Sequence, residues 1–217
     1  MWLIIFCMIG FFAFIIIANK QKEKQIAARK RQAFTQVNQT LKQIFDNNTL
    51  ILDTETTGLG DNDQVIELCI LDIHGNSLFD SYIKPKRKMR ADNRAMAVHG
   101  ISNEMLQDAP TWDKVHQQIS EILNGKMIVT YNAEFDLRLL EQTAAKYDLA
   151  IPDCTFECAM HVYTAYQMVE KNESPRRYKL VDACQYFNIR PAGQVHKAYT
   201  DCMMTLELLK AIEKRTQ

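Results

Sequence analysis

The sequence predicts a mixed α/β domain, in which one sheet is flanked by helices, behind an apolar N-terminal helix. Three observations predict this fold. Apolar, strand-like runs open the body of the chain, helical patterns interrupted by one more strand follow them, and the first residues form a separate uncharged run. A chain of 217 residues with 47% hydrophobic residues is long enough for one ordinary core and an appendage.

The N-terminal run, Trp2 to Ala18, is uncharged and almost wholly apolar. As a helix it would be roughly 25 Å long, which is short but adequate for a membrane span. A cleaved signal peptide is the alternative, but no positive residue precedes the run, and Ile16, Ile17 and Ala18 form a poor cleavage site. We therefore expect residues 1–18 to be a retained transmembrane anchor.

A basic segment follows the predicted anchor. Residues 1–33 have a net charge of +5, from Lys20, Lys22, Lys24, Arg29, Lys30 and Arg31 against Glu23. Positive charge beside a span stays on the cytoplasmic side, so the domain at 48–217 is expected to face the cytoplasm. Val37, Leu41, Ile44 and Phe45 recur at helical spacing. Residues 19–47 are therefore predicted to be a basic, amphipathic helical linker with an apolar stripe against the body.

The body is predicted to begin with three antiparallel strands at 50–55, 64–73 and 78–83, with a hairpin at His74-Gly75-Asn76. Helices are expected at 92–98 and 112–123, a fourth strand at 126–131, and further helices at 134–147, 179–187 and 199–214. Between Cys154 and Pro175 the pattern is weak and permits a helix over 158–169.

Charge and cysteine usage argue against nucleic-acid binding by an overall positive charge and against a zinc site. Residues 34–217 have a net charge of −5, so nucleic-acid binding would have to rest on a local basic patch or on metal ions that bridge to phosphate. Cys154 and Cys158 have a metal-like spacing but no second pair. Reduced thiols are the plainer prediction.

Acidic residues stand at the ends of three predicted elements. Asp53 and Glu55 alternate with Thr54 at the end of a strand and so share one face of the sheet. Asp136 lies in the first turn of a helix, and Asp201 opens another, five residues after His196. Singly, these acids fit solvated turns or helix-dipole positions. Together, their oxygens suit Mg²⁺ or Mn²⁺, and the imidazole can take a proton from water.

The blocks ILDTETTG at 51–58, YNAEFD at 131–136 and HKAYTD at 196–201 resemble the three signature blocks of the DEDDh (DnaQ-like) 3′–5′ exonucleases. These enzymes are relatives of the proofreading subunit of bacterial DNA polymerase III, and the similarity covers roughly 50–213. The resemblance implies a ribonuclease-H-like fold. It also implies that two Mg²⁺ or Mn²⁺ ions bind to the carboxylates of Asp53, Glu55, Asp136 and Asp201, with His196 as the general base.

The resemblance also implies substrate contacts. The backbone of Thr56, Thr57 and Gly58 is expected to approach the terminal nucleotide, with Leu59 as a wedge and Asn132 as a further contact. The segment from Val98 to Ser102 is similar to a recurrent family segment. A dense basic run follows the third strand, and it is either a phosphate contact or a solvated loop: Lys84, Lys86, Arg87, Lys88 and Arg90.

The predicted function is therefore release of 5′-mononucleotides from DNA 3′ ends. Two alternatives stay open: the substrate is RNA or a short oligoribonucleotide, or the chain is an inactive, membrane-anchored nucleic-acid-binding scaffold. All five catalytic positions are filled, which argues against an inactive scaffold. The expected partners are a nucleic acid with a free 3′ end, the membrane, and a polymerase or repair protein that the sequence does not identify.

Overall fold

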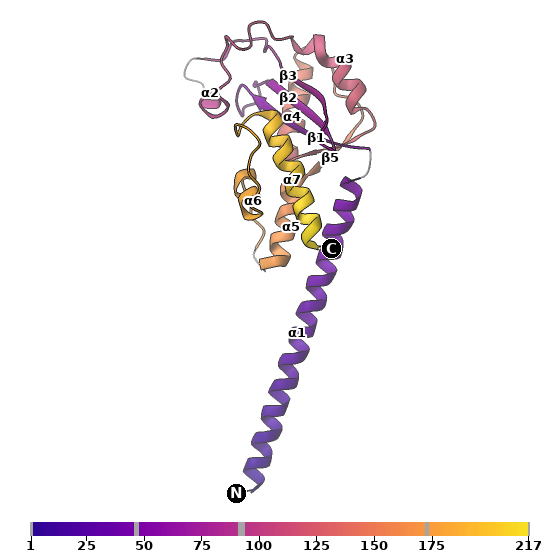
Figure 1. Ribbon diagram of the computed structural model, residues 1–217, viewed down its shortest axis with the longest axis vertical. Helices are drawn as coiled ribbons and strands as arrows, with labels where there is room; N and C mark the ends of the chain where they lie inside the picture. The colour runs from indigo at the N-terminus through magenta and orange to yellow at the C-terminus, as the bar shows by residue number, and fades with distance from the viewer. Residues whose placement is uncertain (1, 46–47, 91–93, 172–173, 217) are drawn as a thin grey trace.

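The computed structural model describes residues 2–45, 48–90, 94–171 and 174–216, with side chains from residue 19 onward. Its centre is a five-stranded mixed sheet in the order β3-β2-β1-β4-β5 (Figure 1). The strands β1 (Thr49–Thr56), β2 (Val65–Asp72) and β3 (Ser77–Tyr82) pair antiparallel. The strands β4 (Met127–Thr130) and β5 (Thr155–Cys158) extend the sheet parallel to β1. The predicted mixed sheet is confirmed, whereas β5 was not predicted.

Seven helices appear in the part of the chain that is described, and the body helices agree with the predicted ones to within a few residues. They are α1 (Trp2–Ile44), α2 (Arg94–His99), α3 (Trp112–Leu123), α4 (Ala133–Ala145), α5 (Ala159–Lys171), α6 (Leu180–Tyr186) and α7 (Ala198–Thr216). The predicted end of the helical linker at residue 47 and the predicted helix start at Asp92 lie outside the described residues.

Helices cover both faces of the sheet, so the central strands are buried on both sides. On β1, Ile51 packs with the core formed by α1, α5 and α7, while Leu50 and Leu52 pack with α3 and α4. The helix α4 begins three residues after β4, a strand parallel to β1. The start of α4 therefore lies at the end of the sheet where β1 also ends.

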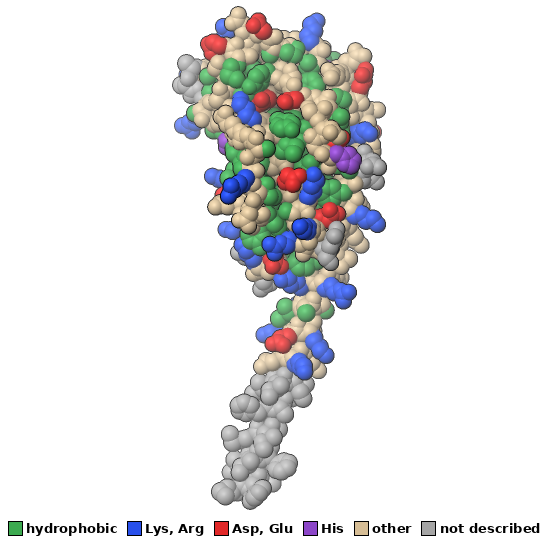
Figure 2. Space-filling view, in the orientation of Figure 1, with side chains coloured by type: hydrophobic (Ala, Val, Ile, Leu, Met, Phe, Trp, Pro, Cys, Tyr) green, Lys and Arg blue, Asp and Glu red, His purple; other side chains and the backbone are tan. Residues whose placement is uncertain are grey.

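The C-terminal third of α1 packs on the body. Val37, Leu41 and Ile44 are buried, which confirms the predicted apolar stripe. The Asn38 amide donates a hydrogen bond to the carbonyl of Thr216 at 2.7 Å and so ties α1 to the end of α7. Residues 19–29 are exposed, and Figure 2 shows Lys and Arg side chains along this part of the helix as it leaves the body.

The predicted membrane span falls on the first turns of α1. Among the helices whose side chains are described, none combines the length and the apolar character needed to cross a bilayer. The side chains of Trp2 to Ala18 lie outside the described residues, so the anchor stays a prediction.

Candidate active site

The end of β1 provides two of the five predicted catalytic side chains. Asp53 and Glu55 lie on the same face of the sheet as Ile51, as the alternation predicts. Thr54 points to the opposite face, where its hydroxyl donates a buried hydrogen bond of 2.8 Å to Oδ1 of Asp136. This bond connects β1 to the first turn of α4.

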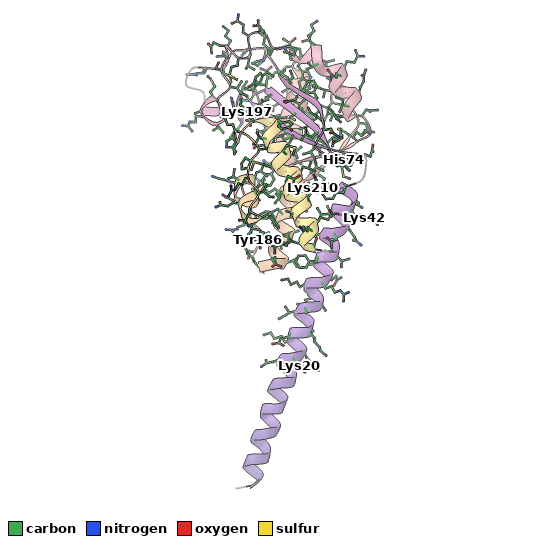
Figure 3. All side chains as sticks on the ribbon, viewed as in Figure 1. Lys20, Lys42, His74, Tyr186, Lys197 and Lys210 are labelled. Atoms are coloured by element: carbon green, nitrogen blue, oxygen red, sulfur yellow. The ribbon has the colours of Figure 1, made fainter. Side chains whose placement is uncertain are left out.

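The start of α7 provides the other pair. Asp201 lies in the first turn of this helix, and the adjacent Cys202 thiol packs 3.5 Å from the Cys69 carbonyl and holds the helix on the sheet. His196 precedes the helix with φ of +62°, a left-handed conformation. Its Nδ1 lies 3.9 Å from Oδ2 of Asp201, and half of its side-chain surface is exposed. Lys197, labelled in Figure 3, marks this end of α7 beside the sheet.

These elements bring three of the predicted residues into one cluster. Ligand atoms of Glu55, His196 and Asp201 all lie within 4.8 Å of one another. Asp53 and Asp136 are outside this cluster but within electrostatic reach, since the charge of Asp136 is the largest Coulombic contribution to the raised pKa of Asp53. The structure therefore gathers all five predicted residues at one sheet edge, three of them in direct proximity.

Burial and mutual repulsion oppose ionisation of these carboxyl groups. Burial, with the nearby charges of Asp201 and Glu67, raises the pKa of Glu55 from its ordinary value of 4.5 to about 8. Burial raises the pKa of Asp136 to about 6, although the hydrogen bond from Thr54 opposes the shift. Burial raises the pKa of Asp53 well above its usual range and also raises that of Asp201, where His196 opposes the effect.

A divalent cation fits this arrangement. Oδ1 of Asp201 is buried and has no hydrogen-bond partner among the described residues. A buried, unpaired carboxylate oxygen is costly unless a ligand satisfies it. Carboxylate oxygens are hard ligands that Mg²⁺ and Mn²⁺ accept. The residues present therefore suit a metal ion, which would also offset the burial and the repulsion that raise the pKa of Glu55.

The raised pKa of Glu55 predicts that the free energy of unfolding of the metal-free protein depends on pH. The folded chain binds the Glu55 proton more tightly than the unfolded chain does, so its free energy of unfolding should fall as pH rises from 4.5 to about 8. At about 1.4 kcal/mol per pKa unit, and with a discount for partial exposure, we expect Glu55 to contribute about 2 kcal/mol to this decline. Urea titrations of the chelator-treated chain across this range measure it.

Two controls accompany this measurement. Glu55→Gln should make the decline smaller, with the remainder coming from the raised pKa values of Asp53, Asp136 and Asp201. Mg²⁺ should stabilise the wild-type chain more at pH 8 than at pH 5. A metal-free stability that is level or rises with pH in both proteins would contradict the assigned electrostatics.

The turn after β1 forms the wall of an open cavity of about 600 Å³ beside the acidic cluster. A Cβ at Gly58 would lie 2.6 Å from the Asp63 carboxylate, which the Thr57 hydroxyl holds in place at 2.7 Å, so the turn requires glycine. Four of the five predicted substrate contacts line this cavity: Thr56, Thr57, Gly58 and Leu59. Asn132 is not among its described lining residues and instead precedes α4, where its carbonyl accepts the Phe135 N–H at 2.9 Å.

Two residues at the site were not predicted to belong to it. Glu67, buried on β2, stands directly opposite Glu55 and accepts the Ala198 N–H at the start of α7 at 3.3 Å. Buried His99 accepts the Ile101 N–H through Nδ1 at 2.9 Å, and its Nε2 lies 3.2 Å from the Thr56 carbonyl. His99 therefore braces the end of β1, and its side chain also lines the cavity. His99 lies within the segment from Val98 to Ser102 that is similar to a recurrent family segment, but no role was predicted for its side chain.

Comparison with known proteins identifies the family. The RNase_T family model, described as an exonuclease, matches residues 50–209. An uncharacterized exonuclease, CP81, of Escherichia phage 186 is 35% identical over 185 residues, covering 82% of this chain and 94% of that protein. The DNA polymerase III subunit epsilon of Escherichia coli K12 is 27% identical over 175 residues, covering 75% of this chain and 70% of the subunit.

A solved structure agrees with this result. Exonuclease X in complex with 5′ overhanging duplex DNA superposes with a TM-score of 0.57 and 25% identity, over 77% of this chain and 92% of that one. This likeness confirms the ribonuclease-H-like fold and the resemblance to DEDDh enzymes. The chain therefore belongs to the RNase_T exonuclease family and is a hydrolase of the DEDDh type.

Proposed function

We propose that this chain is a metal-dependent 3′–5′ exonuclease that removes 5′-mononucleotides from DNA 3′ ends. The observation that supports this proposal most is the convergence of Glu55, His196 and Asp201, whose ligand atoms lie within 4.8 Å, beside an open cavity at the end of β1. DNA is the preferred substrate in this proposal because the relatives include a DNA polymerase III subunit, and the aligned Exonuclease X is in complex with DNA.

The carboxylates are the proposed metal ligands. Asp53, Glu55, Asp136 and Asp201 would hold two Mg²⁺ or Mn²⁺ ions. When bound, the ions would neutralise charge on the scissile phosphate and lower the pKa of a water molecule. The Thr54 hydroxyl supports this arrangement by holding the Asp136 carboxylate at 2.8 Å.

His196 is the proposed general base. Its imidazole is half exposed and stands 3.9 Å from Asp201, so it can face an incoming water molecule without leaving the site. In the proposed reaction, water attacks phosphorus, the imidazole takes its proton, and the bond from phosphorus to the 3′ oxygen breaks. The phosphate stays bonded to the 5′ oxygen of the released nucleotide, and the leaving 3′ oxygen takes a proton from solvent water, so the shortened strand ends in a 3′ hydroxyl.

The turn after β1 is proposed to position the terminal nucleotide. The backbone of Thr56, Thr57 and Gly58 borders the cavity, where a glycine permits close approach. Leu59 is 78% exposed there and offers an apolar surface to a nucleobase. Asn132 remains a proposed contact at the start of α4. A polymerase or repair protein remains a proposed partner.

A nuclease assay tests the function. The full chain, in non-ionic detergent, is incubated with single-stranded DNA, duplex DNA and RNA of matched sequence, with Mg²⁺, Mn²⁺ or excess chelator. We expect metal-dependent hydrolysis of DNA and no hydrolysis in chelator. Faster hydrolysis of RNA would reassign the substrate, and activity that survives chelation would refute the metal requirement.

The anchor is the second part of the proposal. We propose that residues 1–18 span the membrane once and that the catalytic domain faces the cytoplasm, because the basic residues of 19–33 follow the apolar run directly. The full chain should sediment with membranes and resist extraction by high salt. A variant that lacks residues 1–33 retains the buried stripe of α1 that begins at Val37, and it should appear in the supernatant.

Two results would contradict the anchor. One is extraction of the full chain by high salt, and the other is recovery of a secreted protein cleaved near Ala18.

A further inference from the structure

A second cavity, the basic groove, lies beside the proposed nucleotide cavity and has a volume of about 410 Å³. Ten residues line the basic groove, and the charged ones are five bases and one acid: Lys86, Arg87, Lys88, Arg90, Lys146 and Asp63. The acid is already engaged, since its two oxygens accept the Thr57 hydroxyl and the Gly60 N–H, each at 2.7 Å. Residues 34–217 have a net charge of −5, so this positive surface is a local exception.

The loop that contributes the cations is fixed to the body. Met89 is buried, and the side chain of Asn103 binds both its N–H and its carbonyl, at 2.9 and 2.8 Å. The N–H of Lys86 donates to the buried Gln64 amide at 3.2 Å. The loop therefore fixes the backbone from which the exposed Arg87 and Lys88 extend, which reduces the backbone entropy lost when they bind a ligand.

The basic groove is continuous with the nucleotide cavity. Thr57, Asp63 and Arg90 line both cavities, and Gln64 connects the loop to the β1 turn because its carbonyl accepts the Thr57 N–H at 2.8 Å. A nucleic-acid strand whose terminal nucleotide occupies the first cavity has one negative phosphate per further nucleotide. Cations along one loop match that repeating charge.

We propose that the basic groove binds the phosphodiester backbone of the substrate strand, on the 5′ side of the terminal nucleotide. This inference rests on the proposed 3′–5′ exonuclease function. It explains how an acidic body holds a polyanion, because the phosphates lie over the basic loop while only the scissile phosphate meets the carboxylates. The groove acts on affinity for longer strands, since a dinucleotide has no phosphate other than the scissile one.

The test compares short and long substrates. KM is measured for a thymidine dinucleotide and a thymidine dodecanucleotide with the full chain in detergent and Mn²⁺. The double variant Arg87→Ala/Lys88→Ala should raise KM for the long substrate so that the KM ratio of dinucleotide to dodecanucleotide falls about tenfold. The slope of log affinity against log salt should become shallower by about 0.7 for each lost phosphate contact.

A matched control removes two positive charges elsewhere. Lys42 and Lys214 are exposed on α1 and near the end of α7, away from the start of α7 where Lys197 is labelled (Figure 3). The variant Lys42→Ala/Lys214→Ala should keep the wild-type KM ratio and salt slope.

The outcomes separate the two proposals. A wild-type chain that hydrolyses neither substrate refutes the exonuclease function. Wild-type hydrolysis with an unchanged KM ratio in Arg87→Ala/Lys88→Ala overturns the basic groove alone. An effect of this variant on duplex DNA without an effect on the single strand would also overturn it, because the groove would then contact the complementary strand.

Discussion

Replacing Asp53 with asparagine should lower turnover on the order of 10⁴-fold without unfolding the protein. Burial raises the pKa of Asp53, and the charges of three carboxylates, those of Asp136, Asp201 and Glu55, raise it further, so its carboxylate is electrostatically close to all of them. Asparagine has nearly the same shape but no negative charge. It should therefore weaken metal binding while removing repulsion from the metal-free site.

Three measurements on Asp53→Asn check this expectation. Single-turnover hydrolysis should be lost, the Mg²⁺-induced rise in Tm should shrink, and the Tm of the metal-free variant should equal or exceed that of the wild type. A variant with wild-type turnover would remove Asp53 from the catalytic machinery.

Asp72 provides a contrasting control. Its carboxylate accepts the N–H groups of His74 and Asn76 at 2.8 and 2.9 Å in the hairpin between β2 and β3. The substitution Asp72→Ala should lower Tm but leave the turnover of the folded fraction unchanged. The two variants thus distinguish loss of chemistry from loss of structure.

Replacing His196 with alanine should reduce single-turnover hydrolysis by roughly 10²–10⁴-fold, because water would lose its proton acceptor. Metal affinity should change little, since the carboxylates hold the ions in this account. The backbone at His196 has φ of +62°, which alanine tolerates poorly. A fall in Tm is therefore expected for His196→Ala as well, and it has to be separated from the chemical effect.

His196→Gly makes that separation. Glycine adopts positive φ readily, so this variant should fold as the wild type does. The imidazole that it removes is half exposed, which leaves an open space for a free imidazole molecule. Added imidazole should restore part of the turnover of His196→Gly. Full turnover in this variant without imidazole, or a loss of metal binding equal to that of Asp53→Asn, would contradict the role of His196 as the base.

The sequence predicted the catalytic elements because each one combines a strong periodic pattern with a chemically distinctive residue. Asp53 and Glu55 follow the apolar run from Leu50 to Leu52 in β1, and Asp201 lies in the first turn of a long helix, so both their placement and their chemistry could be inferred. The short edge strand β5 was missed, because its four residues are mostly exposed or half-buried and show no hydrophobic run.

Glu67 could not be recognised from its surroundings, since it stands within the apolar run of β2 and outside the signature blocks. Its importance depends on register: the turn between β1 and β2 sets Glu67 opposite Glu55. The expectation that His196 stands just outside the helix that contains Asp201 is confirmed, whereas its left-handed backbone was not predicted. Interactions between distant segments, such as the hydrogen bond from Thr54 to Asp136, also could not be predicted without the fold.

The most direct test of the central claim follows single-stranded DNA labelled at its 5′ end during digestion by the full chain in Mn²⁺, with Asp53→Asn as the control. We expect a ladder of labelled strands that shortens one nucleotide at a time, together with release of 5′-mononucleotides. In excess chelator, or with Asp53→Asn, the labelled strand should keep its full length. Immediate release of a labelled mononucleotide, internal cleavage, or an equal rate with Asp53→Asn would contradict it.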